Sequence, residues 1–298
     1  MKRAVALACA AVLLGAAADA AAWCRMTTSR RQPTATEPCV LPDPSTDPPE
    51  QFLEWRRPCN SVGLSVAAPS RDLSELEVAG VLSRSAATWN AVSCDGVPVS
   101  YELRVLGERT TCTGPHYRDD GGNVNSVQFV LDWAERMYDA NAFAVTTVWH
   151  RRSTGEIVDA DLDLNERRGP FGICPDVGCD TRTVDLENVI THELGHMLGL
   201  AHSTDVDATM FVSAVAGETH KRDLHADDVA GICAVYPPGR PEGDCDPTPI
   251  GGLDLDCSAG CCTVAPGRPS RAGWPLGLAL ALIGARARLR ARAARRRS

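Results

Sequence analysis

The feature that most constrains this chain is the stretch 191–203, which reads Thr-His-Glu-Leu-Gly-His-Met-Leu-Gly-Leu-Ala-His-Ser. His192 and His196 are four residues apart, so on a helix they share one face, where two imidazoles can bind one cation. Gly199 can take a positive φ, which ends the helix and turns the chain. That turn would bring His202 back as a third nitrogen. The stretch therefore predicts a helix followed directly by a tight turn.

The same residues predict a chemistry. Three neutral imidazoles suit Zn²⁺ and leave a fourth position open for water, an arrangement typical of catalytic zinc sites. Glu193 lies beside the first ligand, where its carboxylate can take a proton from that water. We therefore expect His192, His196 and His202 to bind zinc and Glu193 to act as general base in peptide hydrolysis. The alternative is an amphipathic helix with surface histidines, which gives no reason for the fixed spacing.

The extended motif H-E-x-x-H-x-x-G-x-x-H resembles that of the metzincin metallopeptidases, and Ser203 after the third histidine is similar to the matrixin branch. Metzincins carry a methionine turn beneath the metal, and Ala-Thr-Met-Phe at 208–211 fits it, with Met210 as a structural floor. Residues 224–236 are similar to the last matrixin helix. The resemblance covers about 59–236. It implies an α+β, zincin-like domain with a twisted mixed sheet of about five strands and three helices.

The resemblance also implies a protein or peptide substrate. The substrate would lie extended along an exposed sheet edge, placed at Phe143 to His150, and pair through its main chain. The specificity pocket would lie between the methionine turn and Lys221. A monomeric zinc endopeptidase is expected. Two alternatives stay open: a surface protein that keeps the fold only for binding, and an enzyme that cuts one narrow partner. The first would need a broken zinc motif, whereas all three histidines and Glu193 are present.

The N-terminus is typical of a secretory signal peptide. Lys2 and Arg3 precede an apolar run at 4–18, and Ala-Ala-Ala at 20–22 predicts cleavage after Ala22 or Ala20. Export explains the cysteines, because thirteen are present and all but the one at position 9 lie beyond the signal peptide. An even number in an exported chain indicates disulfides.

Disulfide pairing is predicted only in part. Cys174 and Cys179 could close a small loop, and Cys94 and Cys112 flank a predicted strand and could pair with each other. The remaining group, expected to pair among themselves, is Cys24, Cys39, Cys59 and Cys233. Matrixins usually carry a folded pro-domain whose cysteine caps the zinc, and we expect this chain to have no room for one. One of the first three cysteines could cap the metal as a thiolate, but a disulfide is favoured in an exported protein.

The C-terminus combines an apolar run at 272–285 with seven arginines within 286–297. Fourteen apolar residues fall short of the roughly twenty that span a bilayer, although the arginines act as a stop-transfer signal. With Cys257, Cys261 and Cys262 upstream, this order resembles the myxobacterial C-terminal sorting tail. The resemblance implies envelope sorting machinery as a partner, a cell-surface or extracellular location, and one cysteine as a processing or lipid site. The alternatives are an anion-binding tail and ordinary disulfide cysteines.

Charge and composition set the domain organisation. Residues 59–238 hold 27 Asp and Glu against 13 Lys and Arg, which argues against nucleic acid as a partner. The predicted divisions are a signal peptide at 1–22, a Pro-rich extended linker at 23–50, the metallopeptidase domain at 51–238, a Cys/Pro/Gly-rich linker at 239–271, and the apolar, Arg-rich sorting tail at 272–298.

Hydrophobic patterning predicts the supporting elements. Alternation indicates strands at Ser61–Ala67, Val97–Leu106 and Val127–Leu131, and a hairpin of Phe143–His150 with Glu156–Leu164. The first helix should be capped by Asp72, with Glu75 completing a capping box and Leu76 on the apolar face. Asp185 should cap the metal helix at 186–198, and His225 the last helix.

Two acidic clusters could hold cations. Asp159, Asp161 and Asp163 share one face of a predicted strand, although a solvent face is favoured because exposed strand faces are usually polar. Asp-Asp-Gly-Gly-Asn at 119–123 could hold Ca²⁺, although a solvated turn is favoured. The four histidines outside the motif are expected at the surface: His116, His150, His220 and His225.

Overall fold

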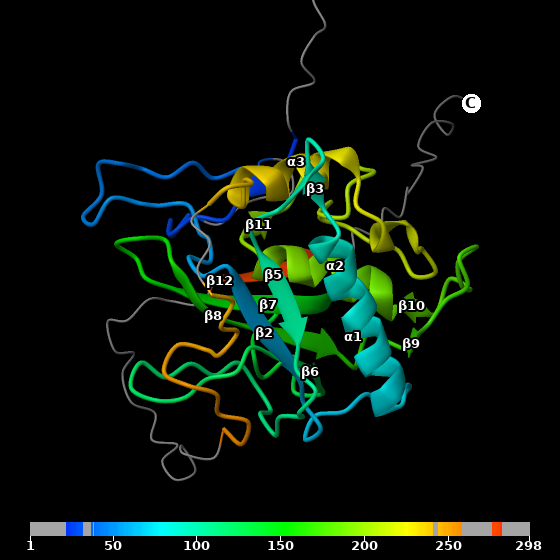
Figure 1. Ribbon diagram of the computed structural model, residues 1–298. Helices are drawn as coiled ribbons and strands as arrows, with labels where there is room; N and C mark the ends of the chain where they lie inside the picture. The colour runs from blue at the N-terminus through cyan, green and yellow to red at the C-terminus, as the bar shows by residue number, and fades with distance from the viewer. Residues whose placement is uncertain (1–21, 32–36, 38, 241–243, 258–275, 282–298) are drawn as a thin grey trace, which may run out of the picture.

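The computed structural model describes residues 22–31, 37, 39–240, 244–257 and 276–281, and its centre is a mixed sheet (Figure 1). The strand order is β12-β7-β8-β6-β2-β5. Strands β5, β2, β6 and β8 are parallel, and β7 runs antiparallel to β8. Their bounds are β2 Cys59–Leu64, β5 Glu102–Val105, β6 Ser126–Val130, β7 Ala142–His150, β8 Ile157–Asn165 and β12 Leu276–Ala281. The predicted mixed sheet is confirmed, with a sixth strand supplied by the tail.

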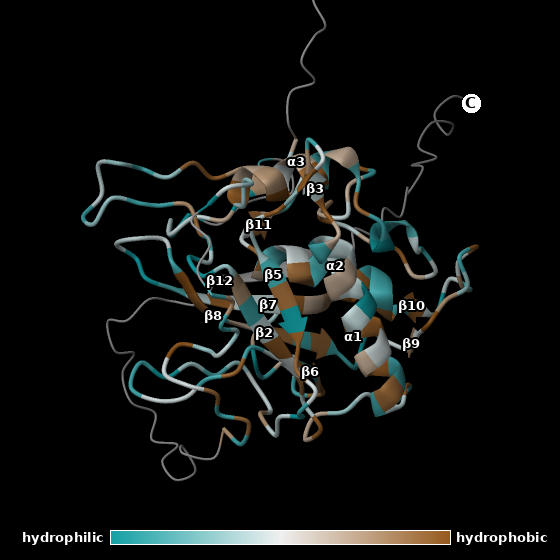
Figure 2. Cartoon of the chain, viewed as in Figure 1, coloured by the Kyte–Doolittle hydropathy of each residue, from teal (hydrophilic) through white to brown (hydrophobic). Residues whose placement is uncertain are grey.

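Three α-helices accompany the sheet in the described residues: α1 Glu75–Asn90, α2 Leu186–Met197 and α3 Ala226–Val235. Helices α1 and α2 pack against each other, and α2 packs against β7 (Figure 1). The indole Nε1 of Trp89 in α1 donates to the carbonyl of Thr191 in α2 at 2.8 Å. Hydrophobic residues are concentrated in strands such as β6, while the long loops carry many hydrophilic ones (Figure 2). The core thus fixes α2 against both α1 and the sheet.

The predicted cap of α1 is wrong. Ser74 is the N-cap, and it forms a capping box with Glu77. The carboxylate of Asp72 instead accepts the backbone N–H of Phe171 at 3.0 Å. Leu76, expected on the buried face, is 81% exposed. The buried face of the helix includes Val78, and a residue two positions earlier lies on nearly the opposite side of a helix.

The predicted strand Val97–Leu106 is divided. Its first part is β4 (Val97–Pro98), which forms a small hairpin with β3 (Ser93–Cys94), and only β5 joins the main sheet. Between them Tyr101 stacks on Tyr236 with ring centroids 4.6 Å apart. This aromatic contact holds the chain against the end of α3 and interrupts the strand.

The segment expected to be extended linker begins with packed residues. Strand β1 (Cys24–Arg25) pairs with β11 (Leu200–Ala201), directly before the third histidine of the motif. Met26 is buried. The backbone N–H groups of Ala22 and Trp23 both donate to Asp227 Oδ1, at 2.9 and 3.0 Å. This stretch therefore supports the turn after α2.

Five disulfides join the described cysteines, and the predicted Cys174–Cys179 loop is confirmed. The predicted Cys94–Cys112 pair is wrong. Within the group of four, Cys24 and Cys39 bond to each other as expected, whereas Cys59 and Cys233 bond to cysteines outside the group. The other bonds are Cys24–Cys39, Cys59–Cys245, Cys94–Cys233 and Cys112–Cys257. Three of these bonds join residues more than 130 positions apart. Such cysteines meet only through tertiary packing. None of these cysteines is a thiolate able to cap zinc.

The acidic face of β8 is not a solvent face. Asp159, Asp161 and Asp163 are at most 1% exposed, because the loop before β6 and the segment after it cover them. Asp161 accepts the N–H of His116 at 2.8 Å, and Asp163 accepts Arg136 Nη1 at 2.9 Å. Both carboxylate oxygens of Asp159 are buried without a hydrogen-bond partner among the described residues. Burial raises the pKa of Asp161 to about 7.

The other histidines differ from expectation in part. His225 caps α3, as predicted. His116 and His150 each bury one ring nitrogen without a partner among the described residues, so they are not simple surface residues. No helix in the described ranges is long and apolar enough to cross a membrane. The arginine block of the tail and Cys261 and Cys262 lie outside the described residues.

Candidate metal centre

The metal helix α2 begins where the sequence predicts. Asp185 is the N-cap, and its Oδ2 accepts the N–H of Asn188 at 2.9 Å. Arg222 Nε donates to the same carboxylate at 2.7 Å. The helix ends at Met197, and Gly199 follows with φ of 92°. A Cβ there would lie 2.8 Å from the carbonyl oxygen of Leu53, so both the positive φ and the close backbone require glycine.

This turn gathers the three histidines of the motif. Ligand atoms of His192, His196 and His202 all lie within 4.8 Å of one another, and the side chains are buried. The Nε2 atoms of His196 and His202 are 3.2 Å apart. Within the part of the chain that the structure describes, no other such cluster of possible metal ligands occurs. The predicted ligand set is thus brought together in space.

Two of the rings are oriented by backbone carbonyls. His192 Nδ1 lies 2.6 Å from the oxygen of Thr209, and His196 Nδ1 lies 2.8 Å from that of Leu200. A carbonyl can only accept, so each Nδ1 carries the proton and each Nε2 presents a lone pair. His192 Nε2 is buried without a partner among the described residues. A zinc ion fits this set of three neutral nitrogens.

Burial also sets the charge of these rings. It lowers the pKa of His192 and of His202 well below the usual value, and that of His196 to about 4. Neighbouring histidines and Lys221 lower the pKa values of His192 and His202 further. The imidazoles are therefore neutral at neutral pH, which is the form that binds a metal.

Glu193 lies between the histidines in sequence and is fully buried. Its Oε2 accepts the hydroxyl of Thr146 in β7 at 2.7 Å, whereas Oε1 has no partner among the described residues. Burial raises the pKa of Glu193 to about 8, although the Thr146 hydrogen bond opposes that rise. A carboxyl group with such a pKa can both accept and return a proton near neutral pH.

The methionine turn lies against the same helix. Met210 is 1% exposed. Asp228 in α3 holds the turn, because its two oxygens accept the N–H groups of Thr209 and Met210 at 2.7 and 2.9 Å. The sequence reasoning missed Asp228. Its place three residues after the cap His225 was a usable signal, since a capping-box carboxylate turns back toward the chain before the helix.

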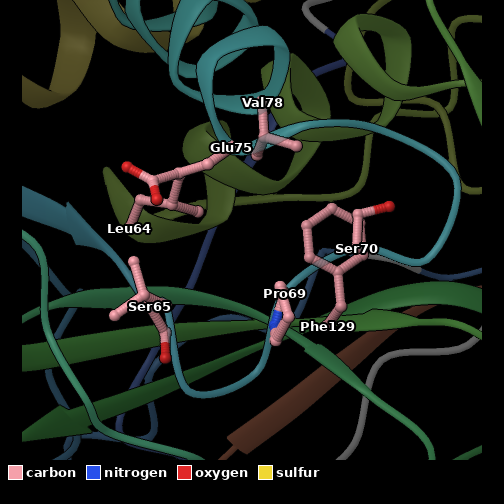
Figure 3. A pocket seen from close by; sticks show the side chains of 8 residues that line it. Leu64, Ser65, Pro69, Ser70, Glu75, Val78 and Phe129 are labelled. Carbon is pink, nitrogen blue, oxygen red and sulfur yellow. The ribbon is translucent and has the colours of Figure 1, made fainter.

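Lys221 is buried beside this turn. Its Nζ donates to the carbonyls of Phe211 and Ser213 at 2.6 and 2.8 Å, and burial lowers its pKa to about 8. A separate small cavity lies between α1 and the strand ends (Figure 3). None of the histidines lines that cavity; its lining is Leu64, Ser65, Val66, Pro69, Ser70, Glu75, Val78 and Phe129.

The sheet edge beside the histidines is covered. Strand β12 of the tail pairs antiparallel with β7, with Leu276 opposite Val148 and Leu278 opposite Thr146. The expectation of an exposed edge at Phe143–His150 is therefore wrong for this structure. The physical reason is that an unpaired strand edge offers main-chain hydrogen bonds to any extended segment within reach.

Comparison with known proteins identifies the domain. Residues 116–237 match the family model of the matrixins. Over this range the chain is similar to the matrixin metzincins. It is also similar to two Arabidopsis thaliana proteins, metalloendoproteinase 1-MMP and metalloendoproteinase 2-MMP. The first is 32% identical over 187 residues, which is 62% of this chain and 45% of that protein. The second is 31% identical over 186 residues, or 61% of this chain and 43% of that protein.

A shorter match is to the interstitial collagenase of Oryctolagus cuniculus, 44% identical over 62 residues, or 20% of this chain and 13% of that protein. The chain spans less than half the length of the two plant relatives. The predicted resemblance to the matrixins and the α+β fold are confirmed by the family match.

Proposed function

We propose that this matrixin-like domain is a zinc-dependent endopeptidase. The observation that carries the proposal is the buried set of three neutral histidines, whose donor atoms lie within 4.8 Å of one another. Glu193, whose Oε1 has no partner among the described residues, directly follows the first of them. A protein that only binds ligands would have no use for this buried carboxyl group, because burying a charged group costs free energy.

His192, His196 and His202 would hold the zinc, which when bound supplies a Lewis acid that activates water and polarises a carbonyl group. Glu193 would take the proton from the attacking water at Oε1 and then give it to the leaving amine. The elevated pKa of this carboxyl supports both steps. Met210 would take no part in proton transfer and would support the histidines from below.

The substrate would be an extended peptide or protein segment. The main chain of β7 is the edge to which it would add, and Lys221 would border the pocket for one side chain. Because β12 pairs with this edge, the tail and the substrate would compete for it. The matched plant proteins are named metalloendoproteinases, which supports proteins as the substrate class. We propose a monomer that does not bind nucleic acid.

We propose that the protein is exported. Five disulfides support an oxidising compartment, as does the signal-like N-terminus. The tail would be recognised by an envelope sorting machinery, which would keep the protein at the cell surface. Since Cys257 is bonded to Cys112, Cys261 and Cys262 would be the processing candidates. Calcium binding at 119–123 stays a prediction of the sequence.

The test is Glu193→Ala in the mature protein. Zinc content should stay near parental, because the three histidines are unchanged. Turnover of casein or a mixed peptide library should fall by about 10²- to 10⁴-fold, the usual contribution of a general base. Near-parental turnover in the variant would refute the role of Glu193. A parental protein that holds zinc but cleaves no peptide would favour the binding protein or the narrowly specific enzyme.

A further inference from the structure

Thr146 connects the sheet to the carboxylate of Glu193. Both side chains are fully buried. The Thr146 hydroxyl lies 2.7 Å from Glu193 Oε2 and 3.2 Å from the Glu193 carbonyl oxygen. Among the hydrogen bonds of the described residues, no other side chain donates to this carboxylate. The shorter distance indicates that the hydroxyl proton is directed to the carboxylate, which is the stronger acceptor.

We infer that Thr146 is the positioning residue of the general base, holding Oε2 so that Oε1 remains the proton acceptor. This inference rests on the proposed function. The two oxygens have separate environments: Oε2 has the hydroxyl, and Oε1 has no partner among the described residues. A carboxylate held at one oxygen by a short hydrogen bond loses rotational freedom about its last torsion, which is otherwise broad.

The position of Thr146 makes it suited to this role. It lies in the middle of β7, opposite Leu162 of β8, so the sheet fixes its backbone. Its β-branched side chain has few χ1 rotamers, and the direction of the hydroxyl is therefore well defined. The Glu193 carboxylate is thus restrained by a hydrogen bond from the sheet in addition to its attachment to its own helix.

The test compares Thr146→Val with a control that loses a similar bond elsewhere. Valine keeps the shape of threonine and removes the hydroxyl. We expect kcat to fall about 10- to 100-fold, the scale of an imprecisely placed catalytic group, with KM and zinc affinity near parental. Thr146→Ser should recover most of kcat, because it restores the donor.

Thr191→Val is the matched control. Thr191 precedes His192 and donates its buried hydroxyl to Ser85 Oγ at 3.0 Å, so the variant loses a hydrogen bond that does not involve Glu193. We expect its kcat to stay parental even if its unfolding midpoint falls. Zinc affinity is measured by chelator competition for all variants, and stability by denaturant unfolding. A crystal structure of zinc-free Thr146→Val should show the Glu193 carboxylate displaced or in several rotamers.

Parental kcat in Thr146→Val, or an equal loss in Thr191→Val, would overturn the positioning role. So would an unchanged Glu193 side chain in the variant structure. These outcomes leave the proposed function intact, because the parental enzyme is active in each. A parental protein that holds zinc but has no activity would instead reject the proposed function, and the role of Thr146 with it.

Discussion

Gly195 and Met210 are so close that a Cβ on Gly195 would lie 2.2 Å from the Met210 sulfur. Gly195 stands between the two helical histidines, where a helix would ordinarily favour alanine. The same added atom would lie 2.9 Å from the Trp89 ring. The glycine therefore lets the methionine turn pack directly against the metal helix. Thr209 in the same turn orients His192 through its carbonyl oxygen.

Gly195→Ala should destabilise the fold by about 1–3 kcal/mol, the usual cost of overpacking a core, and should lower zinc affinity by displacing Met210. Urea unfolding measures the first effect and chelator competition the second. Gly80→Ala in α1 is the control, since its Cβ would meet only Arg84 Nη1 at 3.5 Å, an ordinary contact. It should be neutral or stabilising by up to about 1 kcal/mol. Equal stability of the two variants would contradict the packing argument.

His202→Ala should weaken zinc binding strongly, because two histidines alone lack the ligands to hold the ion. Metal content after dialysis is the measurement. His220→Ala serves as control, since that side chain is 47% exposed, lies 4.0 Å from Glu218 and is not a member of the cluster. If His202→Ala kept one zinc per chain, the third ligand would have to be another residue.

Asp159→Asn tests the buried acidic face. Burial, with Asp161 beside it, raises the pKa of Asp159 well above 3.8. The folded state therefore binds more protons than the unfolded state above that pH, and stability should fall as pH rises from about 4 toward 7 and beyond. The variant should flatten this fall and gain about 1–3 kcal/mol at pH 8, because a buried neutral amide costs less free energy than a buried ionised carboxylate without a partner.

Unfolding midpoints from pH 4 to 8, with and without added Ca²⁺, measure this effect. If the face holds a cation, Ca²⁺ should stabilise the parent and not the variant. A variant that is less stable than the parent at every pH, without any cation effect, would show that the Asp159 charge is not a cost to the fold.

Deleting 272–298 should free the edge of β7 and raise kcat/KM on peptides, chiefly through KM. The gain should be about tenfold or more, because a tethered competitor acts at an effective concentration near millimolar. The protein should also appear soluble in the medium, since the arginines that resist passage through a bilayer are gone. Deleting only 282–298 is the control, because it removes the arginines and keeps β12.

Mass spectrometry of the mature C-terminus completes this test. If the tail is a sorting signal, the mature protein should lack the arginine block and fractionate with the envelope. Full-length protein that is soluble in the medium would show that the tail neither anchors nor sorts. Equal kcat/KM for the two truncated proteins would show that β12 does not block the edge.

The sequence by itself determined the features that depend on near neighbours. The four-residue spacing of His192 and His196 needs only a helix, and the Asp185 cap and the Gly199 turn follow from local backbone chemistry. Period-two alternation was enough for the hairpin of β7 and β8. Both Asp72 and Ser74 can cap a helix, and the prediction of Asp72 for the start of α1 was wrong. Ser74 is the cap, because the Asp72 carboxylate accepts the backbone N–H of Phe171.

Only the tertiary structure decided which distant groups meet. The contact of Thr146 with Glu193 spans 47 positions, and the bond between Cys94 and Cys233 spans 139. The burial of Asp159 depends on loops that cover β8. Such proximities are set by the packing of helices and strands against one another, and side-chain periodicity within a single element carries no information about its distant partners. The histidine motif could be recognised in the sequence because its spacing is local, whereas the contact between Thr146 and Glu193 can be seen only in the folded protein.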